Sequence, residues 1–129
     1  MIVDASAVVA IIQSEPDATD LLALMRAADV LHMATPTALE LTIALGRDQV
    51  ERTRNILAEM GIRLVDFTTE QQEVAQHAFA RYGRGSGSKA RLNFGDCIVY
   101  ALAKVMDEPL LFKGDDFTHT DITPAITRG

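Results

Sequence analysis

The chain has 129 residues, of which 48% are hydrophobic, and it carries a formal net charge of −6 at pH 7. This length and apolar content predict one globular domain over residues 1–129 and favour a folded chain over a disordered one. No run of about 18 apolar residues is present, so we expect no membrane-spanning helix. The excess of acids argues against a general nucleic-acid coat protein but does not exclude a nuclease.

Two further features indicate where the protein works. Residues 1–12 are apolar, but they include Asp4 and lack a basic leader, so we do not expect a signal peptide. The single cysteine, Cys97, cannot form an internal disulfide, which fits a reducing compartment. We therefore predict a cytoplasmic protein without a membrane anchor.

The first quarter of the chain alternates apolar runs with helical patterns. Residues 1–4 predict a short buried strand, and residues 5–13 predict a buried helix. Pro16 suits the first turn of a helix over about 16–28, and residues 30–33 predict a second strand. On the inner face of the second helix we expect Leu21, Leu22, Leu24 and Met25.

The middle of the chain predicts two helices and another strand. Thr35 is a good N-cap and Pro36 a good first helical residue, and Gly46 can end that helix. A second amphipathic helix over 47–60 precedes a strand over 62–67. We expect the inward side chains of the two helices to be Leu39, Ile43, Leu45, Val50, Ile56, Leu57 and Met60.

The last part of the chain continues the alternation. A helix over 68–82, capped by one of the two threonines at its start, leads into a glycine-rich flexible loop over 83–90. An apolar helix over 96–107 is followed by a strand over 110–112 and by an edge strand over 121–123. Helices that alternate with short strands predict an α/β fold with a mostly parallel sheet of four or five strands.

Five acidic residues lie where strands or loops meet helices: Asp4, Glu40, Asp96, Asp115 and Asp116. In an open α/β sheet the carboxyl ends of the strands face one crevice, so these side chains should meet there. Gathered carboxylates repel one another unless a divalent cation neutralises them. The pattern therefore predicts a Mg²⁺ or Mn²⁺ site for phosphodiester chemistry, since such ions activate water and relieve charge on the leaving oxygen.

The acids would have different roles at such a site. We expect Asp4 and Asp96 to bind the metal directly, and Glu40 to bind it through water or to orient the attacking water. Asp115 or Asp116 would complete the site. Two neighbouring polar side chains would support it by hydrogen-bonding a ligand carboxylate or a phosphate: Ser6 and Asn93.

Each acid also has a purely structural interpretation. Asp4 and Asp96 are good N-cap residues, and Glu40 suits the dipole of a first helical turn. The pair Asp115 and Asp116 fits a surface turn. Only their joint placement at one end of a sheet favours the metal site over these alternatives.

Positive charge is concentrated in the glycine-rich loop and just after it. Arg84, Lys89 and Arg91 could contact an RNA backbone, and the alternative is a merely mobile loop. The loop does not match the phosphate-binding loop of nucleotide-binding proteins. The three histidines show no metal-ligand spacing and are expected to be structural or exposed: His32, His77 and His119.

Four segments together resemble a PIN-domain ribonuclease, specifically the VapC toxins of bacterial VapBC toxin–antitoxin pairs. They are Met1–Ala7, Thr35–Glu40, Leu92–Cys97 and Leu110–Phe117. The resemblance spans essentially the whole chain and implies a PIN-like three-layer α/β/α fold. It also implies a Mg²⁺- or Mn²⁺-dependent endoribonuclease that cleaves cellular RNA and arrests translation, with Asp4, Glu40, Asp96 and either Asp115 or Asp116 as its acids.

The same resemblance implies partners. VapC proteins usually form homodimers and are inhibited by a VapB antitoxin, which often places a basic residue in the acidic pocket. The helices at 17–28 and 47–60 would form the groove that receives the antitoxin, and the alternative is that their side chains only pack on the sheet. The apolar anchors would be Leu21, Leu24, Leu57 or Met60.

Two other functions fit parts of the pattern. A non-catalytic interaction module could use an acidic pocket only to bind a basic partner segment. A haloacid-dehalogenase-like phosphatase also begins with an Asp after a strand, but it needs a second Asp two residues later, where this chain has Ser6.

Overall fold

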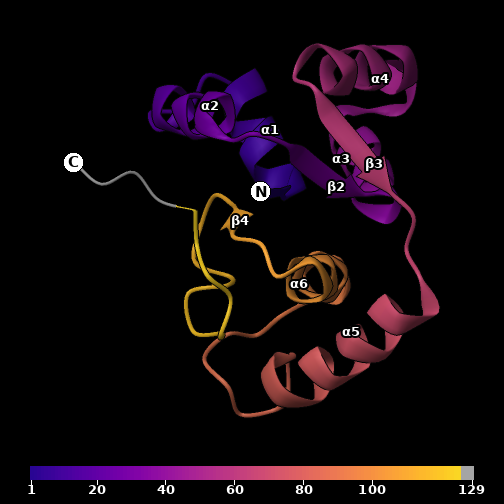
Figure 1. The fold of residues 1–129 in the computed structure, drawn as a ribbon, viewed down its shortest axis with the longest axis vertical. Coiled ribbons are helices and arrows are strands. Elements are labelled where there is room, and N and C mark those ends of the chain that lie inside the picture. Colours follow the sequence, from indigo (N-terminus) through magenta and orange to yellow (C-terminus); the bar gives the residue numbers. More distant parts are fainter. Residues whose placement is uncertain (126–129) are drawn as a thin grey trace.

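The computed structural model describes residues 1–125 and contains a parallel sheet of four short strands (Figure 1). The strands are β1 (Ile2–Val3), β2 (Leu31–Ala34), β3 (Ile62–Val65) and β4 (Leu110–Leu111). Their order in the sheet is β3-β2-β1-β4, and each neighbouring pair is parallel. β1, the first strand in sequence, is therefore central, and its carboxyl end points in the same direction as those of the other three.

Within the described residues, six α-helices cover the two faces of this sheet and make the predicted three-layer fold (Figure 1). They are α1 (Ala5–Ile12), α2 (Ala18–Ala27), α3 (Thr35–Leu45), α4 (Val50–Glu59), α5 (Thr69–Tyr82) and α6 (Phe94–Met106), with a 3-10 turn at Arg47–Gln49 before α4. On the central strand β1, Val3 packs in one core with α1 to α4, and Ile2 packs in a second core with α5 and α6. This alternation follows from the two-residue period of a strand.

Several element ends differ from the prediction. α6 begins at Phe94, two residues before Asp96, and Asn93 is its N-cap. Ala34 is the N-cap of α3, so Thr35 lies inside that helix. The expected strand at 121–123 is instead a single parallel bridge between Leu110 and Pro124, because only two backbone hydrogen bonds join the two segments.

The predicted inner faces of two helices are partly wrong. On α3 the side chains of Leu39 and Ile43 are 62% and 72% exposed, and Thr37 and Leu41 are buried instead. Both pairs are four residues apart, so each forms a stripe along one side of the helix. The sheet and its neighbouring helices bury the stripe that contains Leu41. On α4, Val50 is likewise exposed.

The proposed antitoxin anchors also differ from expectation. Leu21 and Leu57 are buried, and Leu24 and Met60 are partly buried and packed against the same core. The alternative interpretation, that these side chains pack in the core, therefore holds for Leu21 and Leu57. In the described part of the chain, no helix has the length and apolar character needed to cross a bilayer.

Candidate active site

Asp4 lies at the carboxyl end of the central strand. Its backbone N–H donates to the carbonyl of Leu111 on β4 (3.0 Å), and its side chain caps α1. The Ser6 backbone N–H (3.2 Å) and the Ser6 hydroxyl both donate to Oδ2 of Asp4. The N-cap interpretation of Asp4 is therefore correct. It is compatible with a site, because the cap engages one carboxylate oxygen and fixes the side chain at the crevice.

Ser6 also connects Asp4 to the segment after β4. Its Oγ accepts a hydrogen bond from the backbone N–H of Lys113 (3.0 Å), and the Lys113 ammonium pairs with Asp17 before α2 (3.0 Å). Further along, the buried Phe117 packs edge-on against Phe112. The turn between them, which carries the last two predicted acids, is thus anchored at both ends.

Asp96 occupies the third position of α6 and forms a capping box with Asn93. The Asp96 N–H donates to Oδ1 of Asn93 (2.9 Å), and the Asn93 N–H donates to Oδ2 of Asp96 (3.0 Å). Asn93 rather than Asp96 is therefore the N-cap, which corrects the structural interpretation of Asp96. The backbone N–H of Asn93 thus orients the Asp96 carboxylate, and the Asn93 amide oxygen is occupied by the Asp96 N–H.

Glu40 reaches the site from the second turn of α3, not from the first turn as its structural interpretation required. Its carboxylate lies directly over Gly95, and a Cβ atom at position 95 would collide with it. A glycine at the second position of α6 is thus what lets α3 and α6 bring their acids together. Sequence reasoning did not single out Gly95, although a glycine beside a candidate metal ligand is a usable signal.

Four of the acids act on one another electrostatically. Burial, and next the charge of Asp116, raises the pKa of Asp4 above its ordinary value. Burial raises the pKa of Asp96 to about 7, and the charges of Asp116, Asp4 and Glu40 add to this. Partial desolvation and the charge of Asp4 raise the pKa of Glu40. The structure thus brings Asp4, Glu40, Asp96 and Asp116 together.

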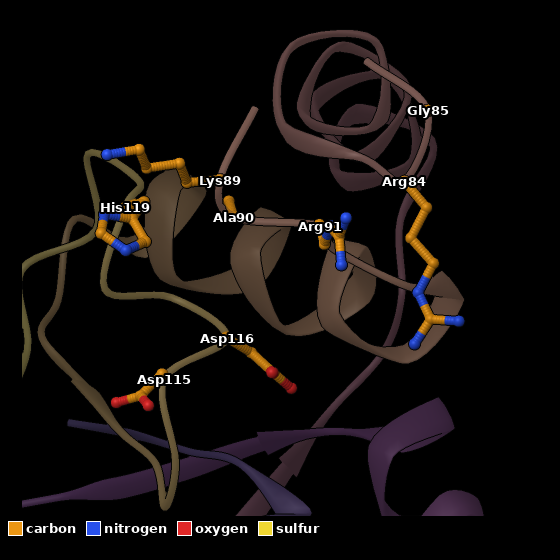
Figure 2. Close-up of a pocket in the computed structure, with 8 residues that line it drawn as sticks. All are labelled: Arg84, Gly85, Lys89, Ala90, Arg91, Asp115, Asp116 and His119. Atoms are coloured by element: carbon orange, nitrogen blue, oxygen red, sulfur yellow. The ribbon is translucent and has the colours of Figure 1, made fainter. Parts of the chain in front are cut away.

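The ambiguity between the last two acids is resolved by side-chain direction. Asp115 and Asp116 point different ways from the same turn (Figure 2). Of these two acids, only Asp116 is among the charges that, together with burial, raise the pKa values of Asp4 and Asp96. Asp116 is therefore the fourth member of the acidic cluster, which we define as Asp4, Glu40, Asp96 and Asp116, and Asp115 lies at its edge.

The acidic cluster has the chemistry of a divalent-cation site. Within residues 1–125 none of its carboxylates forms an ion pair, and Lys113, on the segment after β4, is paired with Asp17. In the same residues, no group of three or more acidic, histidine or cysteine side chains is arranged to hold a metal ion together. Mg²⁺ needs only one or two protein carboxylates, because it keeps several of its waters. The donor set therefore fits such an ion.

A cavity of about 690 Å³ opens beside the acidic cluster (Figure 2). It lies between the loop that joins α5 to α6 and the turn after β4. The residues that line it are Arg84, Gly85, Lys89, Ala90, Arg91, Asp115, Asp116 and His119. The three basic residues predicted to contact RNA are thus next to the acids. His119 is exposed, as one of the two expectations had it, and it lies on the cavity wall.

An exposed apolar surface borders the acidic cluster on its other side. Leu39 and Phe94 each line two neighbouring grooves, which makes the surface continuous from β3 across α3 to α5. We call the exposed side chains on it the apolar band: Leu39 (62% exposed), Ile43 (72%), Leu64 (52%), Phe79 (57%) and Phe94 (85%). The largest groove, about 600 Å³, is lined mainly by apolar side chains of α5 and α6.

Comparison with known proteins gives consistent matches. The sequence model of the PIN domain matches residues 1–122. Ribonuclease VapC42 of Mycobacterium tuberculosis is 47% identical over 131 residues, covering 98% of this chain and 100% of the relative. Among solved structures, VapC20 of Mycobacterium tuberculosis, described as a sarcin-ricin loop cleaving toxin, has a TM-score of 0.75 at 15% identity, with 98% of each chain covered. A toxin-antitoxin complex from Klebsiella pneumoniae has a TM-score of 0.72 at 18% identity, covering 93% of this chain and 92% of that one.

Proposed function

Because the chain belongs to the PIN-domain family, and within it to the VapC ribonucleases, we propose that it is the toxin of a toxin–antitoxin pair and cleaves cellular RNA with Mg²⁺ or Mn²⁺ at the acidic cluster. The observation that supports the metal-dependent chemistry is the convergence of four carboxylates whose charges are not neutralised by any ion pair within residues 1–125. Such a cluster favours binding of a dication over remaining empty, because the ion relieves the mutual repulsion.

Each acid has a role that its position allows. Asp4 and Asp96 would hold the ion, since hydrogen bonds from Ser6 and Asn93 fix both carboxylates. Glu40, which is more accessible to solvent, would orient the attacking water, and Asp116 would complete the site through water. When bound, the ion would supply an activated water and would offset charge on the leaving oxygen. No step needs the Asp115 carboxylate.

Cleavage of RNA by the purified chain, free of any partner, tests this proposal. We expect cleavage with Mg²⁺ or Mn²⁺ and none in EDTA. The variants Asp4→Asn, Asp96→Asn and Asp116→Asn keep the side-chain shape but remove the charge, so each should lose at least about 100-fold in rate. Asp115→Asn is the matched control and should cleave normally. Equal activity of Asp96→Asn and the wild type would refute the assignment.

The main alternative is an interaction module that uses the acidic cluster only to bind a basic segment. It predicts no RNA cleavage under any metal condition, and the same assay therefore separates the two functions. The phosphatase alternative requires a second aspartate at position 6, where this chain has Ser6. The Ser6 hydroxyl is hydrogen-bonded to the Asp4 carboxylate and to the Lys113 backbone N–H.

The partners we propose are a second copy of the chain and a VapB-type antitoxin. The apolar band supports a homodimer, because continuous exposed apolar surface is uncommon on monomers and a two-fold axis lets one patch bind itself. A solved structural relative is described as a toxin-antitoxin complex, which supports the antitoxin. A basic antitoxin side chain that enters the acidic cluster would replace the metal charge and inhibit cleavage.

A further inference from the structure

One wall of the cavity carries positive charge that no carboxylate within residues 1–125 neutralises. We call Arg84, Lys89, Arg91 and His119 the basic wall (Figure 2). Across the cavity are Asp115 and Asp116. In the described residues, no ion pair within 4.0 Å joins the basic wall to these acids. Charges of opposite sign therefore face each other across about 690 Å³ of open space.

Two backbone hydrogen bonds hold the segment around Arg91 at the base of the loop. The Leu92 N–H donates to the carbonyl of Tyr82 (2.9 Å), and the Arg84 N–H donates to the carbonyl of Leu92 (3.2 Å), which closes the base of the loop. Ala90 and Leu92, on either side of Arg91, are buried.

Arg91 itself has a φ of 53°, in the left-handed region that residues with a side chain seldom adopt. Such strain persists only where the surroundings enforce it, and it is concentrated at binding and catalytic sites. Here both neighbours of Arg91 are buried, and the Arg91 side chain lines the cavity (Figure 2).

On the basis of the proposed ribonuclease activity, we propose that the basic wall, with Arg91 as its main residue, binds the RNA phosphate next to the one that is cut. A guanidinium matches two phosphate oxygens at once, which a lysine cannot do. RNA carries a negative charge at every linkage, so when one phosphate lies at the acidic cluster a neighbouring phosphate is available to the wall. The wall would set the register of the strand without reading its bases, because phosphate contacts position and base contacts specify.

The acidic cluster and the basic wall would then bind RNA in complementary ways. The acids repel a phosphate until a cation neutralises them, whereas the wall attracts a phosphate without any metal. The contribution of the wall should therefore be measurable in EDTA, separately from catalysis.

The first test measures binding of a short fluorescein-labelled single-stranded RNA in EDTA by fluorescence anisotropy. Asparagine tolerates the left-handed backbone, so Arg91→Asn removes the charge with little strain. We expect it to weaken binding about tenfold and to flatten the slope of log K against log salt by about 0.7. Arg91→Lys, which keeps the charge but loses the fork, should be intermediate. Arg26→Ala, an exposed arginine on α2, is the control and should match the wild type.

The second test locates the phosphate. In an RNA that the wild type cuts, single linkages near the cut are replaced one at a time by neutral methylphosphonate. One linkage beside the cut should raise KM for the wild type with kcat little changed, and the same replacement should have no further effect on Arg91→Asn. Equal sensitivity of both proteins at every linkage would overturn the proposal.

The two proposals fail in different ways. A wild-type chain that cuts no RNA contradicts the proposed function, and the anisotropy measurement still decides whether the wall binds phosphate. Equal affinity and equal salt slope for the wild type, Arg91→Asn and Arg26→Ala would overturn the wall whether or not the chain cleaves RNA.

Discussion

The Asp96 carboxylate is buried next to three other acids, so its negative charge destabilises the metal-free protein at neutral pH. Its pKa is raised to about 7, compared with about 3.9 for an aspartate in an unfolded chain. The folded state therefore holds the Asp96 proton more tightly than the unfolded state does. The stability that this gives is fully present below about pH 4 and is lost as the pH rises through 7, by on the order of 2–4 kcal/mol.

Replacing Asp96 by Asn should therefore stabilise the metal-free chain at high pH. Because the neutral amide keeps the shape and can still accept the Asn93 N–H, we expect Asp96→Asn to raise Tm in EDTA at pH 8 by roughly 5–10 °C. The gain should shrink as the pH is lowered to 5. Circular dichroism melts of the variant and of the Asp115→Asn control give the comparison. A variant that melts no higher than the wild type at pH 8 would contradict the raised pKa.

At the scale of elements, α3 contributes side chains both to the core and to the exposed apolar band. The stripe that contains Leu41 packs in the core, and the stripe that contains Leu39 and Ile43 belongs to the apolar band. From the middle of the same helix Glu40 reaches the acidic cluster, over Gly95. A partner bound to the apolar band would therefore lie next to the site and could control access to it.

The proposed homodimer can be disrupted on α3 without disturbing the core. Ile43→Glu places a charge on the apolar band, so we expect it to convert a dimer into a monomer. Stability of the fold should change by no more than about 0.5 kcal/mol, because Ile43 is 72% exposed. Ala44→Glu, an exposed neighbour on the same helix, is the matched control. Sedimentation velocity over a range of concentrations distinguishes the outcomes, and a wild type that is monomeric throughout would exclude the homodimer.

At the scale of the whole molecule, the parallel sheet links metal binding to protonation. Segments as distant as Asp4 and Asp116 meet because the ends of β1 and β4 are neighbours. Burial, and after it the repulsion between neighbouring acids, raises the pKa of three of the four acids in the cluster. A metal ligand must be deprotonated, so binding of a cation has to displace the protons that this repulsion retains.

Metal binding should consequently release protons near neutral pH. At pH 6.5 we expect about one proton to leave per Mg²⁺ or Mn²⁺ bound, and the number should fall toward zero at pH 8.5, above the pKa of Asp96. Isothermal titration calorimetry in two buffers of different ionisation enthalpy counts these protons. Asp96→Asn should release fewer of them. Identical binding enthalpies in both buffers at pH 6.5 would show that the cluster is already ionised.

The sequence by itself determined the alternation of strands and helices and the acids at their junctions. Periodicity, caps and turn residues act over a few neighbouring positions, so the strands over 1–4 and 110–112 and the helix ending at Tyr82 were predictable. The motifs around Asp4 and Asp96 could also be recognised from the sequence, because each places an acid at the end of a strand or helix within about seven residues.

Only the tertiary structure decided which of several locally equivalent choices the chain uses. Two stripes of α3 have the same period, and the helices packed against it select the one to bury. Asp115 and Asp116 occupy the same turn, and its anchoring by Ser6 and Phe117 selects Asp116. His119 belongs to the basic wall only because the fold brings it to the same cavity as Arg91, which is nearly thirty residues earlier in the chain. Such choices depend on contacts between segments far apart in sequence, and no local pattern encodes them.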